Sequence, residues 1–200
     1  MCGIVGVGRR PSRREPPDGS ELVAAMEAAV RVVEAAANTV TVDDVCRAAD
    51  EVEAVDRLLR GVAVVRTLLA ERHVAVALDD RAHRIGTRLR AIEAELDARA
   101  EAPDELEAWN AALVRCKDAV WAVAHDRLRN ARAVGELAGA GASVASLEAF
   151  TSVQVALSAI DRLEVRGRDS AGLTVVVRNH GLADADPAVR SLLAAREADA

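Results

Sequence analysis

The second residue of the chain is a cysteine, and this position gives it chemistry that an internal cysteine lacks. Initiator Met1 is normally removed when the next residue is small, which would leave Cys2 with a thiol and a free α-amine on one residue. The pKa of an unperturbed α-amine is about 8 and that of a thiol about 8.5, so modest shifts poise either group near neutral pH. The amine can accept the thiol proton, directly or through water, and Cys2 is therefore a candidate catalytic nucleophile.

The residues after Cys2 suit a site at the end of a strand. Gly3 has no Cβ, so its backbone can approach a substrate closely. Residues 4–7, with the sequence IVGV, are β-branched and interrupted by glycine, which predicts a buried strand that would hold the nucleophile rigidly. The alternative is that Cys2 is only a small apolar residue at the start of that strand, and residues 1–6 alone do not decide between the two.

A second motif, LEVRGRDSAGL, occupies residues 163–173. Together with MCGIVG at residues 1–6, it resembles the class II glutamine amidotransferases, which have the N-terminal-nucleophile hydrolase fold. The two motif sequences are most similar to those of the glutaminase domain of the glutamine–fructose-6-phosphate aminotransferase (glucosamine-6-phosphate synthase) family. The resemblance implies that Cys2 attacks the side-chain amide of glutamine, forms a γ-glutamyl thioester and releases ammonia, after which water frees glutamate.

The resemblance also implies roles for residues of the second motif. Arg166 matches the arginine that lies beside the nucleophile in the family, and Gly167 permits the tight turn there. Asp169 and Ser170 are expected to be structural and to bind backbone groups through their side chains. From the residues alone, Arg166 could instead be a cation that complements the C-terminus of a helix. Neither a metal ion nor an organic cofactor is implied.

Apolar residues recur at intervals of three and four along much of the chain between the motifs, which is typical of helices that bury one face. After a helical stretch from Glu21 to Ala37, residues 41–44 (TVDD) offer a new N-cap. The expected apolar seams are Val45 to Leu69 in one helix, Ile85 to Leu96, and Leu106 to Val123. Another amphipathic helix is expected from Phe150 to Leu163. These seams predict an antiparallel helical bundle.

The predicted fold class is α+β, an incomplete N-terminal-nucleophile hydrolase (glutaminase) core interrupted by a long helical insertion. Residues 1–19 would form the first strand and a loop, and residues 20–145 the inserted bundle. Residues 146–200 would continue the glutaminase domain with a helix and a strand at 172–177, followed by a helix-like or frayed tail. Such an insertion is tolerable because loop-closure entropy grows slowly with length and a bundle has its own core.

The chain departs from the family in three respects. The insertion occupies a place where the family has only a short segment, and Val165 and Arg168 stand where tyrosines are usual. The family's later motifs, which grip the glutamine carboxylate and amine and form the oxyanion hole, do not occur in the chain. Since one oxyanion-hole donor is worth about 10²- to 10³-fold in rate, we expect these 200 residues alone to be nearly inactive, as a fragment or a degenerate relative.

The remaining residues with chemical potential have structural explanations. Cys46 and Cys116 lie on or beside apolar seams and are expected to be core thiols. Trp109 and Trp121 are expected to be apolar anchors of the bundle. His73, His83 and His125 share no ligand spacing and are expected on the surface or at seams, and His180 is expected in a turn without an evident partner.

Composition limits the other possibilities. A net charge of −6 gives no electrostatic case for nucleic acid, and the basic stretch at residues 9–14 is interpreted as a solvated loop. We expect no membrane-spanning segment and no secretory signal. Three cysteines far apart in the sequence, without a signal, indicate the cytoplasm and no disulfide framework.

The implied partners are glutamine and a sugar-phosphate acceptor, fructose 6-phosphate, bound by an isomerase domain that lies outside this chain. A homodimer is one expected assembly. Two alternatives stay open at this point. The first is another class II amidotransferase with a different acceptor, such as a phosphoribosyl substrate. The second is a catalytically inactive glutaminase whose helical bundle is an interaction module.

Overall fold

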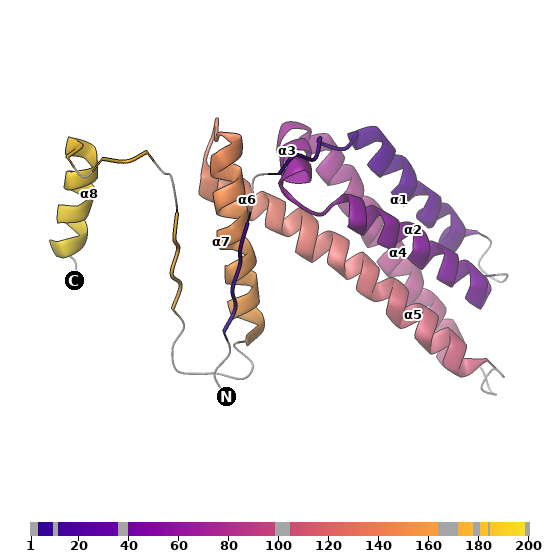
Figure 1. Cartoon of the computed structure of the whole chain (residues 1–200). Helices are drawn as coiled ribbons and strands as arrows, with labels where there is room; N and C mark the ends of the chain where they lie inside the picture. Colours follow the sequence, from indigo (N-terminus) through magenta and orange to yellow (C-terminus); the bar gives the residue numbers. More distant parts are fainter. Residues whose placement is uncertain are drawn as a thin grey trace. The chain divides into compact units, whose positions relative to one another are not determined.

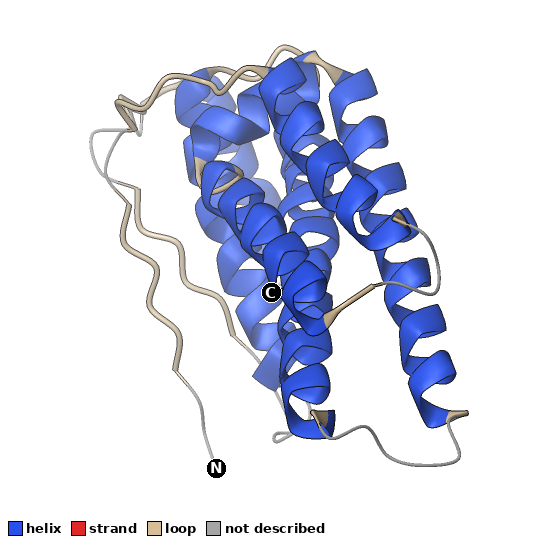
Figure 2. Cartoon of the chain, turned by 90° about the vertical axis from the view of Figure 1, so that its right-hand side faces the viewer, coloured by secondary structure: helices blue, strands red, loops and turns tan. Residues whose placement is uncertain are grey.

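The computed structural model describes residues 4–9, 12–35, 40–98, 105–163, 172–177, 181–183 and 185–198. Regular structure in these ranges is entirely helical, and no β-strand occurs among them (Figure 2). The chain divides into two compact units, Met1–Arg168 and Asp169–Ala200. The first unit contains the helical bundle, and the second contains one further helix.

The predicted α+β fold class is therefore wrong for the described residues, because the strand segments of a hydrolase core are absent there. Residues 4–9 and 172–177 have no regular secondary structure and form no strand pair. Ile4 is 98% exposed and Val176 is 78% exposed, so neither segment is a buried strand. Their β-branched residues favour extended backbone, but a strand also needs a hydrogen-bonded neighbour and an apolar face to cover.

Two capped helices begin the bundle. Helix α1 spans Gly19–Glu34, and the side chain of Asp18 accepts a hydrogen bond from the amide of Ser20 at its N-terminus. Helix α2 spans Val42–Leu58 after Thr41, whose side chain and backbone form a capping box with Asp44. The N-cap predicted within residues 41–44 is confirmed, and the capping residue is Thr41.

The seam predicted as one helix from Val45 to Leu69 is broken in the structure. Helix α2 ends at Leu58, and helix α3 spans Val62–Ala70. Gly61 lies between them with φ of 94°, a conformation that L-residues with a Cβ rarely adopt. The apolar spacing continued across the break because residues on both sides face the same core.

The other seams form long helices as predicted. Helix α4 spans Arg72–Asp97, and helix α5 spans Leu106–Trp121. The chain then continues through a π-helical segment, η1 (Ala122–Arg129), into helix α6 (Asn130–Ala138). The expected seams of α4 and α5 are buried, apart from Leu106 at the start of α5.

One apolar core lies between these helices (Figure 1). Helix α1 packs against α2 and α4, and α2 packs against α5. Trp109 is buried in this core, as predicted, whereas Trp121 is 48% exposed and the prediction that it anchors the bundle is wrong. The largest fully buried side chains include Leu22, Met26, Leu78, Ile85 and Leu89.

Helix α7 (Val144–Leu163) follows α6 and packs against α6 and α3. The predicted helix is confirmed, but its predicted apolar seam is not the buried face: the buried side chains described on α7 are Leu147 and Thr151, and Leu157 is 40% exposed. In the second unit, helix α8 spans Pro187–Ala198 and has no buried residue, in agreement with the expected helical tail.

Candidate functional site

The four residues predicted for the site, Cys2, Gly3, Arg166 and Gly167, lie outside the described residues. Their proposed roles therefore stay predictions. The structure describes the chain next to these residues. Segment 4–9 follows Cys2 and Gly3, and helix α7 ends at Leu163, shortly before Arg166 and Gly167.

The N-terminal segment is bonded to helix α7. The Ser12 amide donates to Glu148 Oε1 at 2.7 Å, and Arg9 Nε donates to Ser152 Oγ at 2.9 Å. Moving from Ser12 back to Arg9 thus advances the contact along α7 from Glu148 to Ser152. The segment consequently runs antiparallel to α7, and its start lies toward the C-terminal end of the helix (Figure 1).

Two further hydrogen bonds fix the chain between this segment and helix α1. The Arg14 guanidinium donates to the carbonyl of Arg60, just after the end of α2, at 3.0 Å. Thr67 Oγ1, on α3, donates to the carbonyl of Pro17 at 3.1 Å. Together with the contacts to α7, they tie the N-terminal part of the chain to α3, α7 and the end of α2.

The other two cysteines have the structural role expected of them. Cys116 is fully buried on α5, and burial raises the pKa of its thiol to about 12. Such a thiol is protonated at neutral pH and is a poor nucleophile. Cys46 is partly buried on α2 and packs against the same core.

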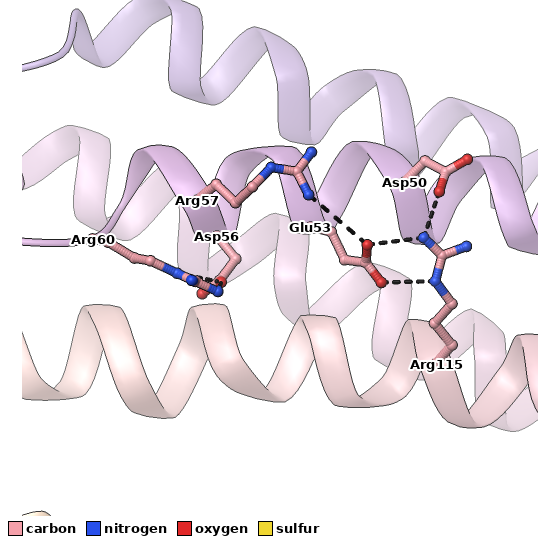
Figure 3. Close-up of polar contacts among 6 residues, drawn as sticks. All are labelled: Asp50, Glu53, Asp56, Arg57, Arg60 and Arg115. Atoms are coloured by element: carbon pink, nitrogen blue, oxygen red, sulfur yellow. Dashed lines mark hydrogen bonds and ion pairs between the residues drawn. The ribbon is translucent and has the colours of Figure 1, made fainter.

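Acidic residues of α2 face arginines of the neighbouring helices. Arg115, on α5, donates to Glu53 Oε1 and Oε2 at 2.7 and 2.8 Å and also bonds Asp50 (Figure 3). These hydrogen bonds raise the pKa of Arg115 and lower that of Glu53. Arg57 approaches Glu53 as well, at 4.0 Å.

Asp56 is the buried member of this row, with 8% of its side chain exposed. It accepts from Arg60 at 2.6 Å and from Arg127, on η1, at 2.7 Å. Burial raises the pKa of Asp56, but the hydrogen bonds and charges of the two arginines outweigh it and leave the pKa below its ordinary value. The arginines neutralise the carboxylates of Asp50, Glu53 and Asp56. These ion pairs are therefore structural contacts between α2 and its neighbours.

A shallow cleft of about 660 Å³ lies between α2 and α5. Its polar lining includes Glu53 and Arg115, which are already bonded to each other, together with Glu107, Asn110 and Asp118. Within the described ranges, no group of three or more His, Cys, Asp or Glu side chains could hold a metal ion. The cleft therefore has neither a nucleophile nor a preformed cation site.

An exposed aromatic stack is a feature that the sequence reading missed. The rings of Trp121 and His125 are stacked, with centroids 4.9 Å apart and planes within 8°. The Arg162 guanidinium, from α7, lies 5.3 Å from the centroid of the Trp121 ring and pairs with Asp126. The spacing of Trp121 and His125 by four residues on one helix was the available signal. These contacts join Trp121, at the end of α5, and Asp126, on η1, to the C-terminal half of α7.

No known protein family, curated protein or solved structure matches the chain. The family resemblance thus rests on the two motifs alone. In the part of the chain that the structure describes, no helix is both long and apolar enough to span a membrane.

Proposed function

We propose that this chain supplies the nucleophile of a glutamine-hydrolysing amidotransferase, with Cys2 as the catalytic residue. Two observations together carry the proposal. The chain contains both motifs, and segment 4–9 runs antiparallel to α7. The first motif occupies residues 1–6, and the second begins at Leu163, the last residue of α7. Segment 4–9 runs toward that end of the helix (Figure 1). This arrangement supports a site in which residues far apart in sequence act together.

In the proposed reaction, the α-amine of Cys2 accepts the thiol proton and the thiolate attacks Cδ of glutamine. The carbon–nitrogen bond breaks, and the departing nitrogen takes a proton from the α-ammonium group of Cys2. Ammonia departs, and a γ-glutamyl thioester on Cys2 remains. Water attacks the thioester, its proton returns to the amine or the thiolate, and glutamate is released. Arg166 would order the turn and the charge beside the nucleophile, and Gly167 would permit that turn.

The acceptor that we propose is a sugar phosphate, because the amino-acid sequence of the second motif resembles the amidotransferases that act on sugar phosphates. Fructose 6-phosphate would then be converted to glucosamine 6-phosphate by an isomerase domain outside these residues. The cytoplasm is the proposed compartment, in keeping with free thiols at Cys46 and Cys116. A phosphoribosyl acceptor is the other option for the same glutamine chemistry.

The proposal requires Met1 to be removed, which can be tested by the chemistry of the N-terminus. 2-Cyanobenzothiazole condenses stably with an amine and a thiol on one residue, whereas its adducts with internal thiols reverse. Denatured protein should give one stable adduct per chain, and peptide mapping should place it at Cys2. A protein that retains Met1 and gives no stable adduct would contradict the proposal, because the thiol would lack its neighbouring base.

The second candidate function treats the bundle as an interaction module on an inactive glutaminase. It is favoured by the extent of the bundle, whose core is built from helices α1 to α6 with one residue of α7. The two candidates differ in whether Cys2 reacts with glutamine. A chain with an intact N-terminal cysteine that never forms a covalent species with a glutamine analogue would favour the interaction module.

A further inference from the structure

Helix α5 has a second face, turned away from the core, with the residue spacing of a helix–helix contact. Six exposed residues recur there at intervals of four and three along α5 and η1. We call this set the outer stripe: Glu107, Ala111, Val114, Asp118, Trp121 and His125. Alternating intervals of three and four keep side chains on one side of a helix, and two helices interlock along such a line. The outer stripe lies wholly within the first compact unit.

The outer stripe combines exposed apolar surface with unpaired charges. Val114 and Trp121 are 57% and 48% exposed. Four of the six residues also line the shallow cleft of about 660 Å³. Within the described ranges, no hydrogen bond or ion pair engages the side chain of Glu107 or Asp118. The face therefore has both an apolar area to cover and carboxylates that a partner can bind.

We propose that the outer stripe is the interface of a homodimer, in which the outer stripe of a second copy packs against it in the antiparallel direction. The intervals of the stripe are four, three, four, three and four, and they read the same from either end. A twofold axis midway between residues 107 and 125 therefore places each stripe residue opposite another stripe residue. A twofold-symmetric contact requires such self-complementarity, because the same patch is used by both copies.

The residues that face each other in this register match in size and charge. Ala111 lies opposite Trp121 of the second copy, so a small side chain leaves room for the largest one of the stripe. Glu107 lies opposite His125 of the second copy. The Arg162 guanidinium lies over the Trp121 ring that stacks on His125, so the Glu107 carboxylate meets an imidazole and a guanidinium.

The middle pair gives Asp118 a partner as well. Asp118 lies opposite Val114 of the second copy and is therefore close to the neighbouring Arg115. The side chain of Arg115 is 41% exposed, and it can bond Asp118 while it keeps its bonds to Glu53. In this way the contact supplies cations to both unpaired carboxylates of the outer stripe.

Charge selects the antiparallel direction over the parallel one. In a parallel pair with the stripes in register, each residue would face its own copy. Glu107 would then lie against Glu107 and Asp118 against Asp118, and like charges across an interface are repelled. Two Ala111 residues facing each other would also leave a gap beside two crowded Trp121 rings. Only the antiparallel register pairs unlike charges and unlike sizes.

The size of the outer stripe predicts a weak, reversible dimer. From Glu107 to His125 it spans about 27 Å at 1.5 Å per residue. One pair of helices in contact over this length lies at the low end of interface sizes, where association is transient. The contact uses none of the residues assigned to glutamine hydrolysis, so this inference stands or falls separately from the proposed function.

Sedimentation velocity of the 200-residue chain under reducing conditions tests the interface. Loading concentrations of about 5 µM to 0.5 mM suit a transient contact, and the mean sedimentation coefficient should rise from monomer toward dimer. Val114→Glu should raise the dimer Kd at least about tenfold, because each dimer would bury two carboxylates without partners. Val76→Glu is the matched control, since Val76 is 69% exposed on α4, and it should leave Kd unchanged.

A charge exchange tests the antiparallel register. Glu107→Lys places a cation opposite His125 and Arg162 of the second copy, and His125→Glu places two carboxylates opposite each other, so each variant should weaken the dimer. The double variant restores opposite charges at both ends of an antiparallel pair and should recover most of the parent affinity. A parallel pair would instead face lysine with lysine and glutamate with glutamate.

The proposal is supported if Val114→Glu weakens the dimer, Val76→Glu does not, and the double charge variant recovers it. Thermal unfolding at the lowest concentration should be the same in all variants, which shows that the fold is intact. Equal effects of the two valine variants, or no recovery in the double variant, would overturn the interface. A parent chain that stays monomeric over the whole range would overturn it too, and would leave the outer stripe to a partner other than a second copy.

Discussion

Glutamine hydrolysis by the Cys2→Ala variant should fall by at least about 10³-fold relative to the parent protein, measured as glutamate release by the longest polypeptide that the reading frame encodes. The substitution removes the atom that forms the thioester, so no other group in the N-terminal residue can replace it. In hydrolases that form a covalent intermediate, removal of the catalytic nucleophile lowers kcat by up to about 10⁶-fold. The lower bound allows for slow hydrolysis by bound water.

Two other cysteine variants control for this result. Cys46→Ser changes a partly buried thiol on α2 and should leave hydrolysis unchanged within about twofold. Cys2→Ser keeps a nucleophile and the N-terminal amine but replaces the thiol by a much weaker acid, so its rate should lie between those of the parent and Cys2→Ala. Retention of the parent rate by Cys2→Ala would contradict the assignment.

Asp56→Ala should lower the free energy of unfolding by about 2–3 kcal/mol, measured by urea denaturation at pH 7. Removing one partner of a buried ion pair costs about 3–5 kcal/mol when the other charge stays buried. Here the side chain of Arg60 is 60% exposed and can return to water, whereas that of Arg127 is only 24% exposed. The expected loss is therefore smaller than the general figure.

Asp50→Ala is the matched control for Asp56, because it removes another aspartate of α2 that pairs with an arginine. The side chain of Asp50 is 65% exposed, and Arg115 keeps its two bonds to Glu53, so the change should stay within about 0.5 kcal/mol. An equal loss of stability in the two variants would contradict the structural role of the Asp56 cluster.

The stabilisation by Asp56 should also depend on pH in a defined direction. Its pKa is lowered in the folded state, so the stabilisation is fully present above the ordinary aspartate pKa of about 3.9. It is lost as the pH falls through the lower folded-state pKa, where the carboxyl gains a proton. The stability difference between the parent and Asp56→Asn should therefore be constant from about pH 7 to pH 5 and shrink below about pH 4.

The sequence predicted the local features of the bundle well. Thr41 caps helix α2, and the seam from Ile85 to Leu96 has the spacing of a buried helix face. Both features depend only on residues that are close in sequence. The break at Gly61 was missed because the apolar spacing on either side continues across it. Trp121 was assigned to the core by size alone, although it lies one residue beyond the buried seam position Val120.

The predicted strands failed for a non-local reason. Residues 4–7 and 172–177 have strand-like composition, but a strand also requires a hydrogen-bonding partner, which composition does not specify. The contact of Arg9 with Ser152 joins residues 143 positions apart, and no local pattern signals it. The site itself rests on Cys2, Gly3, Arg166 and Gly167, which lie outside the described residues, so the sequence remains the source of that prediction.

The central claim is that Cys2 is the residue that attacks glutamine, and covalent trapping tests it most directly. 6-Diazo-5-oxo-norleucine is a glutamine analogue in which a diazoketone replaces the carboxamide, and a thiolate that attacks it forms a stable carbon–sulfur bond as dinitrogen leaves. We expect one adduct per chain, located at Cys2 by peptide mapping and prevented by excess glutamine. An adduct at Cys46 alone, or no adduct in protein with a free N-terminal cysteine, would contradict the claim.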